Sequence, residues 1–150
     1  MNKYQHTLEK LENNTAKRSI TLVIEGALIG VLAGLTAVLY RYCLTYAESG
    51  LYAVLNFIRG NAGVTALWFA ALILMGCIVA KIVKWEPMAA GSGIPQVSGE
   101  VRGYLDQSFW RVVLAKFTGG TLSIFGGLSL GREGPSIQLG AMVAKSYSRL

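Results

Sequence analysis

The sequence predicts an all-α polytopic membrane protein that contains broken, partly inserted helices. The first observation is composition: of 150 residues, 53% are hydrophobic and only 15% are charged. The second is that long uncharged runs recur along the chain, and the third is a pair of short glycine–proline motifs that interrupt them. Because about a quarter of the residues in soluble domains are charged, this composition excludes an ordinary soluble globular domain.

The net charge of +6 does not indicate a nucleic-acid-binding protein. The basic residues are scattered and flank the apolar runs, as lysine and arginine do at the borders of membrane helices. Cys43 and Cys77 lie far apart in apolar surroundings, with neither a CxxC spacing nor a cluster of other metal ligands. The sequence therefore predicts free thiols, no metal site, no cofactor and no nucleic-acid partner, with membrane lipid as the surrounding medium.

The first two predicted elements are a polar arm and a membrane span. Apolar residues recur at helical spacing within the polar residues 1–18, so an amphipathic helix on the cytoplasmic surface of the membrane is expected. The first span is predicted at about 19–47. Its first part, Ser19 to Tyr40, is apolar except for Glu25 and would rise about 33 Å as a helix, which is enough to cross a bilayer.

Two further spans are predicted, at about 62–84 and 109–131. The last of these contains Arg111 and Lys116, which are expected to extend toward one membrane surface while their apolar stems stay along the helix. The segment between the two spans is too polar and too broken by glycine and proline to cross the membrane.

The distribution of basic residues predicts the orientation. Lysine and arginine concentrate before the first span and around the connection that follows the second span. Because loops rich in these residues stay in the cytoplasm, the N-terminus and the "GSGIP" connection are expected there. The loop from Ser49 to Asn61 is then expected outside, and the expected location is the bacterial plasma membrane.

The motifs "GSGIP" at 91–95 and "GREGP" at 131–135 are built alike, with glycines around polar residues and then a proline. Proline is favoured in the first turn of a helix, so each motif predicts a loop that leads into a helix, from about residue 95 and about residue 135. A helix N-terminus offers unpaired N–H groups to an anion, and glycine lets the anion approach the backbone. Inside a membrane, such loops occur only where they line a protein-walled cavity or pore. The pair therefore predicts broken helices that meet at an ion pathway.

These residues resemble the N-terminal part of a CLC family protein, the family of chloride channels and chloride/proton antiporters. The resemblance rests on "GSGIPQV" at 91–97 and "GREGPSIQLG" at 131–140, each after an apolar span, and it covers essentially the whole chain. It implies a CLC-like fold for residues 19–150, as the N-terminal portion of a transmembrane domain. The implied function is chloride transport as part of a voltage-gated-type chloride channel or a chloride/proton antiporter.

The resemblance implies roles for the residues of the first motif. Ser92 matches the serine whose hydroxyl binds chloride, and the backbone amides around Gly91, Ser92 and Gly93 would line the inner part of the path. Serine at position 92 resembles the chloride-selective members of the family. Gln96 departs from the family pattern, because many relatives have an acidic residue there.

The second motif would supply the gate. Glu133 matches the gating glutamate, whose carboxylate occupies an anion position and moves aside when it is protonated. Arg132 and Gly134 lie beside it, and nearby amides would complete the outer anion site. Whether Arg132 pairs with Glu133 or faces elsewhere is left open by the sequence.

The resemblance also implies parts that these 150 residues do not contain. They are a GxFxP segment, a late tyrosine, a second, inward-facing glutamate used for protons, and the helices of the dimer interface. The chain is therefore expected to be a fragment that inserts into the membrane without conducting anions by itself. A homodimer is expected for the full-length protein but not for this fragment.

Two other classes of function are considered. In the first, Glu133 would be the general base of a membrane-embedded enzyme, but no serine–histidine pair or metal cluster supports it, since the only histidine, His6, lies in the polar arm. The chain is thus predicted not to be an enzyme. In the second, the chain would be a non-transporting membrane fragment with a structural or partner-binding role.

Overall fold

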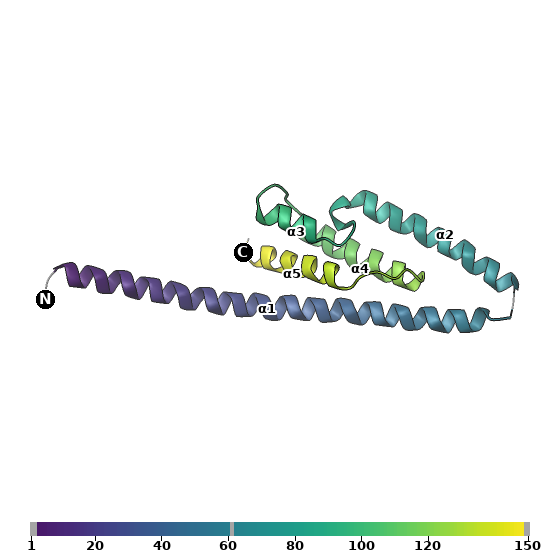
Figure 1. Cartoon of the computed structure of the whole chain (residues 1–150), viewed down its shortest axis with the longest axis horizontal. Helices are drawn as coiled ribbons and strands as arrows, with labels where there is room; N and C mark the ends of the chain where they lie inside the picture. The colour runs from purple at the N-terminus through teal and green to yellow at the C-terminus, as the bar shows by residue number, and fades with distance from the viewer. Residues whose placement is uncertain (1–2, 61, 149–150) are drawn as a thin grey trace.

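The structure is a computed structural model that describes residues 3–60 and 62–148, with side chains from Arg18 onward. The described residues contain helices and loops and no strand, so the predicted all-α class is confirmed. The helices, in chain order, are α1 (Lys3–Ile58), α2 (Ala62–Trp85), the short 3-10 helix η1 (Pro87–Ala89), α3 (Ile94–Val101), α4 (Phe109–Phe125) and α5 (Glu133–Ser148). Figure 1 shows α4 and α5 side by side along α1, while α2 returns from the far end of α1 and leads to α3.

Helix α1 is longer than the predicted arm and first span. It is one continuous helix from Lys3 to Ile58, with no interruption after residue 18 and no end at residue 47. The segment contains no proline, so nothing breaks the hydrogen-bonded ladder until Gly60, whose φ is 95°. The predicted loop from Ser49 is therefore helical to Ile58. Asn61 and the side chains of residues 1–17 lie outside what the structure describes, and the surface role of the arm stays a prediction.

Helix α4 is shorter than the predicted third span of 109–131. It begins at Phe109 but ends at Phe125, where Gly126 and Gly127 follow. The N–H of Gly127 donates to the Ile124 carbonyl at 2.9 Å, and the N–H of Leu128 donates to the Ser123 carbonyl at 3.0 Å. This is the Schellman pattern of helix termination, and it needs the positive φ of 87° that Gly127 adopts. The uncharged residues after Gly127 therefore form a loop that leads to α5.

Among the described residues, two segments are long and apolar enough to cross a membrane, Arg18–Ile58 within α1 and the whole of α2. Large apolar side chains cover them, and Val23, Val38, Leu67 and Ile73 are 65–71% exposed. An apolar surface of this extent is unfavourable in water and favourable against lipid or further protein. These surfaces agree with the predicted membrane protein.

The core lies where α1, α4 and α5 meet. Its buried residues are Tyr40, Leu44 and Ala47 of α1, Ile124 of α4 and Leu139 of α5. The Tyr40 ring also meets the Phe117 ring edge to face, with centroids 5.2 Å apart. Edge-to-face aromatic pairs add directional contact to apolar burial. This packing fixes α5 beside α4 and so fixes the position of the loops at their N-terminal ends.

Candidate functional site

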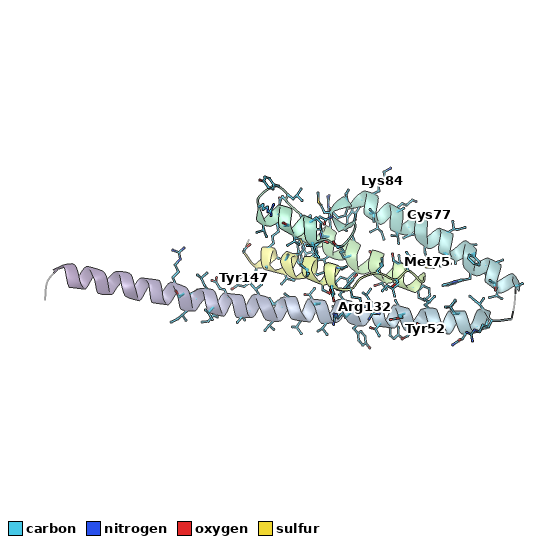
Figure 2. All side chains as sticks on the ribbon, viewed as in Figure 1. Tyr52, Met75, Cys77, Lys84, Arg132 and Tyr147 are labelled. Atoms are coloured by element: carbon cyan, nitrogen blue, oxygen red, sulfur yellow. The ribbon has the colours of Figure 1, made fainter. Side chains whose placement is uncertain are left out.

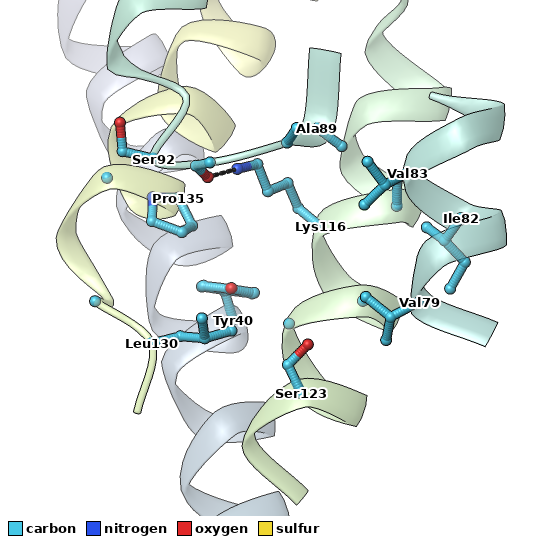
Figure 3. Close-up of a pocket in the computed structure, with 17 residues that line it drawn as sticks. Tyr40, Val79, Ile82, Val83, Ala89, Ser92, Lys116, Ser123, Leu130 and Pro135 are labelled. Carbon is cyan, nitrogen blue, oxygen red and sulfur yellow. Dashed lines mark hydrogen bonds between the residues drawn. The ribbon is translucent and has the colours of Figure 1, made fainter. Parts of the chain in front are cut away.

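The two glycine–proline motifs are in direct contact. A Cβ atom added to Gly134 would lie 2.7 Å from both Cβ and the carbonyl oxygen of Ser92. The backbone of the first turn of α5 therefore lies against Ser92, at a distance that only glycine permits. Figure 3 shows Ser92 of the first motif next to Pro135 of the second.

The first motif forms a turn between η1 and α3. Gly91 and Gly93 have positive φ values of 65° and 85°, which favour glycine, and Gly93 is the N-cap of α3. Ser92 is exposed, and its hydroxyl oxygen accepts the N–H of Ile94 at 3.4 Å. Since that bond uses an acceptor lone pair, the O–H of Ser92 is left as a donor. Pro95 lies in the first turn of α3, as predicted.

The second motif forms the start of α5. Glu133 is the first residue of the helix, is exposed, and has no hydrogen bond or ion pair within the described part of the chain. Arg132 instead pairs with Glu48 of α1, with an Nη2–Oε2 distance of 2.5 Å and with both side chains more than a third exposed. The question that the sequence left open is thus answered: Arg132 faces α1, and its charge is taken up by Glu48.

Several backbone donors surround the contact between the motifs. The N–H groups of Gly91, Ser92, Glu133 and Gly134 have no backbone acceptor among residues 3–60 and 62–148. Two of them open α5, a helix of 16 residues whose N-terminal end carries partial positive charge. The structure thus brings Gly91, Ser92, Glu133 and Gly134 close together, whereas the Arg132 side chain points away to α1. Chemically, this is an assembly of donors that suits a small anion.

The position of Lys116 differs from the prediction that its side chain extends toward a membrane surface. The residue is instead 5% exposed, and its Nζ donates to the Gly91 carbonyl at 2.7 Å. No salt bridge to Lys116 occurs among the residues that the structure describes. The reason is that α4 places Lys116 beside the polar turn before α3, whose carbonyl gives a buried ammonium group a partner. Arg111, by contrast, is exposed and stacks on Trp85 at 5.8 Å.

A cavity of about 370 Å³ lies beside the turn, and Lys116 lines it together with Tyr40, Ser92, Ser123 and Gly134. In Figure 3 Tyr40 enters the cavity from α1, and Ser123 faces it from α4. The ammonium group of Lys116 brings a positive charge to a region with no carboxylate at salt-bridge distance from it, among the described side chains. In the sequence, the single lysine in the apolar run "VVLAKFTGG" could have indicated this buried charge.

Two buried glutamines were also missed. Gln138 of α5 is fully buried, and its Nε2 donates to the Met88 carbonyl at 2.8 Å and to Oε1 of Gln107 at 2.6 Å. Gln107 is 1% exposed, and its own Nε2 donates to Oε2 of Glu100 at 2.7 Å. Glu100 in turn pairs with Lys145 near the end of α5. This network ties the turn before α3 to α5, and the polar residue in the apolar stretch "SIQLG" is one sequence signal for it.

The second half of the chain matches a known family. Residues 70–150 match the family model described as voltage gated chloride channel. Figure 2 shows side chains that this region contributes, with Met75, Cys77, Lys84, Arg132 and Tyr147 labelled. Both glycine–proline motifs and Lys116 lie inside the match.

Curated relatives extend the similarity over most of the chain. The H(+)/Cl(-) exchange transporter ClcA of Vibrio campbellii is 30% identical over 131 residues, which cover 85% of this chain and 28% of the relative. ClcA of Vibrio vulnificus is 32% identical, over 84% of this chain and 27% of the relative. ClcA of Vibrio cholerae is 31% identical, over 88% and 29%. The chain thus spans less than a third of the length of these relatives, and no solved structure matches it.

Proposed function

The chain belongs to the voltage gated chloride channel family, and from this premise we propose that it forms part of a chloride pathway through a membrane. Proteins of this kind are named channels and exchange transporters, so the chain is not an enzyme. The observation that supports a pathway is the contact between Ser92 and Gly134, which joins the two motifs at the start of two helices. Neither motif alone would distinguish an ion site from a tight turn.

In the proposed site, the O–H of Ser92 and the N–H groups of Gly91, Ser92 and Gly93 bind chloride on the side of the first motif. An ion that leaves water needs donors to replace its hydration shell, and these groups provide them without a full positive charge. Exposed Ser92 has a free O–H donor, which supports this assignment. The amides of Arg132 and Gly134 would serve the outer position in the same way.

Glu133 is proposed as the gate. A carboxylate at the N-terminus of α5 competes with an anion for the same N–H groups, whereas the neutral acid does not. The absence of an ion pair to Glu133 among the described residues supports this role, because a side chain without a fixed partner is available to move. The pairing of Arg132 with Glu48 takes up the charge of the residue next to Glu133 in the sequence, which could otherwise hold Glu133 in place.

The relatives' names favour exchange of chloride for protons, so we infer an exchanger rather than a channel. A bacterial plasma membrane with the N-terminus and the "GSGIP" turn on the cytoplasmic side is proposed, on the basis of the basic residues around them. A homodimer of the full-length protein in lipid is part of the same proposal.

Chloride flux through a chimera tests the proposal. In the chimera this chain replaces the matched segment of ClcA from Vibrio cholerae, and chloride release from liposomes is measured with a chloride electrode. We expect selective chloride release that is absent from liposomes without protein. A chimera that elutes as a single folded species and inserts into liposomes, yet releases no chloride, would contradict the proposed function and favour a non-transporting membrane protein.

A further inference from the structure

Three carbonyl oxygens just before Ser92 are each held by a side-chain donor. Gln138 donates to the Met88 carbonyl at 2.8 Å, Gln96 donates to the Ala90 carbonyl at 3.0 Å, and Lys116 donates to the Gly91 carbonyl at 2.7 Å. The donors come from α5, α3 and α4, three different helices. Figure 3 shows the bond from Lys116 to the turn.

The direction of each glutamine amide is fixed by its partners. The Nε2 of Gln107 donates to Glu100, so its Oε1 faces Gln138. Since that oxygen can only accept, Gln138 donates to it through its NH₂ group. The Oε1 atoms of Gln96 and Gln138 are buried and have no hydrogen-bond partner in the part of the chain that is described. Rotating either amide by half a turn would set two acceptor oxygens against each other, so the NH₂ groups face the carbonyls.

Because the peptide unit is planar, fixing a carbonyl group also fixes the direction of the N–H group of the next residue. All described peptide bonds are trans, and in a trans peptide the C=O of one residue and the N–H of the next point in opposite directions. The bond from Gln96 to the Ala90 carbonyl therefore directs the N–H of Gly91 to the opposite side. Likewise, the bond from Lys116 to the Gly91 carbonyl directs the N–H of Ser92 away from Lys116. The Ser92 hydroxyl also points away from Lys116 in Figure 3.

We propose that Gln96 and Lys116 are positioning residues that keep the N–H groups of Gly91 and Ser92 turned toward a bound anion, with Gln138 anchoring the segment upstream. The anion is chloride if the proposed function holds, and the inference rests on that function only for the identity of the ion. These hydrogen bonds are needed because Gly91, at φ 65°, allows either face of the neighbouring peptides to turn outward. A peptide turned the other way would present its carbonyl oxygen, which repels an anion.

The hydrogen bonds from Gln96 and Lys116 orient different N–H groups, so removing each donor is expected to change a different residue's signal. The full 150-residue chain, labelled with ¹⁵N, is studied in aligned bilayers, where the ¹⁵N–¹H dipolar coupling reports the direction of each N–H. Gln96→Met, which keeps size but removes the donor, is expected to lose the fixed coupling of Gly91. Lys116→Met is expected to lose that of Ser92. Ser98→Met on the exposed face of α3 is the control, because it adds the same side chain but removes no donor to the turn.

Chloride is then titrated against gluconate at constant ionic strength. In the wild-type chain the signals of Gly91 and Ser92 are expected to shift and saturate, and Gln96→Met is expected to weaken the apparent affinity about fivefold, the factor for one hydrogen bond. Unchanged couplings in both donor-deleted variants would overturn the positioning role. Couplings lost as expected, with no chloride shift in the wild type, would support the positioning role and contradict chloride binding by these 150 residues.

Discussion

Ser92 differs from an ordinary turn serine in what surrounds its hydroxyl. The oxygen accepts the N–H of Ile94, which leaves the O–H to donate, and the residue is exposed although it contacts the buried Gly134. Any serine that accepts such a bond keeps its O–H free, so what sets Ser92 apart is its position against the first turn of α5. The free donor beside a helix N-terminus is the reason for proposing that Ser92 binds an anion.

Replacing Ser92 with alanine is expected to weaken chloride binding without abolishing it, because the N–H groups of Gly91 and Ser92 remain. One hydrogen bond to an ion corresponds to a loss of about 10- to 100-fold in affinity. Isothermal titration calorimetry on the ClcA chimera measures it, with Ser98→Ala as the matched control on the exposed face of α3. Equal affinities for Ser92→Ala and the unmodified chimera would reduce Ser92 to a turn residue.

At the residue scale, the sequence located the motif residues but not the side chains that hold them. Glycine and proline have local conformational meaning, so Gly91, Gly93 and Pro95 could be assigned to a turn before a helix. Lys116 and Gln138 bond to carbonyls 25 and 50 residues away. Contacts of that range depend on how helices pack, and a single sequence does not encode them in its spacing.

Helices α1 and α4 end elsewhere than predicted, whereas α2 ends within one residue of the predicted 84. Starts have strong local signals, and α3 and α5 begin within two residues of the predicted positions. The end of α4 depends on Gly127 adopting a positive φ, and Gly126–Gly127 alone does not reveal whether a helix stops there. The end of α1 lies past residue 47 because polar residues such as Arg41 and Glu48 suggest a membrane border but do not interrupt a helix.

At the element scale, the approach of α5 to the first motif can be tested with two glycines. Gly134→Ala would place a Cβ 2.7 Å from Ser92, so it is expected to lower stability by about 1–3 kcal/mol, as overpacking does. Gly131→Ala is the control, because nothing lies within 4 Å of its added Cβ. Thermal unfolding in detergent measures both changes.

Similar melting temperatures for the two alanine variants would contradict the close contact between α5 and Ser92. A lower melting temperature for Gly134→Ala alone would support it. The same variant is expected to impair chloride flux in the chimera, since the helix start and Ser92 would be pushed apart.

The orientation of the whole molecule in a membrane depends on α1 and α2, the two helices with exposed apolar surfaces. A bilayer needs about 20 helical residues to cross it, and Arg18–Ile58 provides 41, so α1 extends well past one membrane surface. The turn between α1 and α2, at Arg59 and Gly60, lies at the opposite end from the N-terminus (Figure 1). Basic residues favour a cytoplasmic N-terminus.

Cysteine labelling in intact cells checks this orientation. On a background without Cys43 and Cys77, Asn56→Cys near the end of α1 is expected to react with a membrane-impermeant maleimide without permeabilisation. Ser98→Cys, close to the "GSGIP" turn, is expected to react only after permeabilisation. Both positions are exposed, so access to the thiol depends on the side of the membrane. The reverse pattern would invert the proposed topology.

The proposed gating of a chloride path by Glu133 at the start of α5 can be measured as pH-dependent flux. Chloride and proton fluxes are recorded across a range of pH for the ClcA chimera with and without Glu133→Gln. The amide resembles the protonated acid and does not titrate, so chloride flux is expected to persist while its pH dependence and the coupled proton movement disappear. If Glu133→Gln kept the pH response and proton coupling of the unmodified chimera, Glu133 would not be the gate.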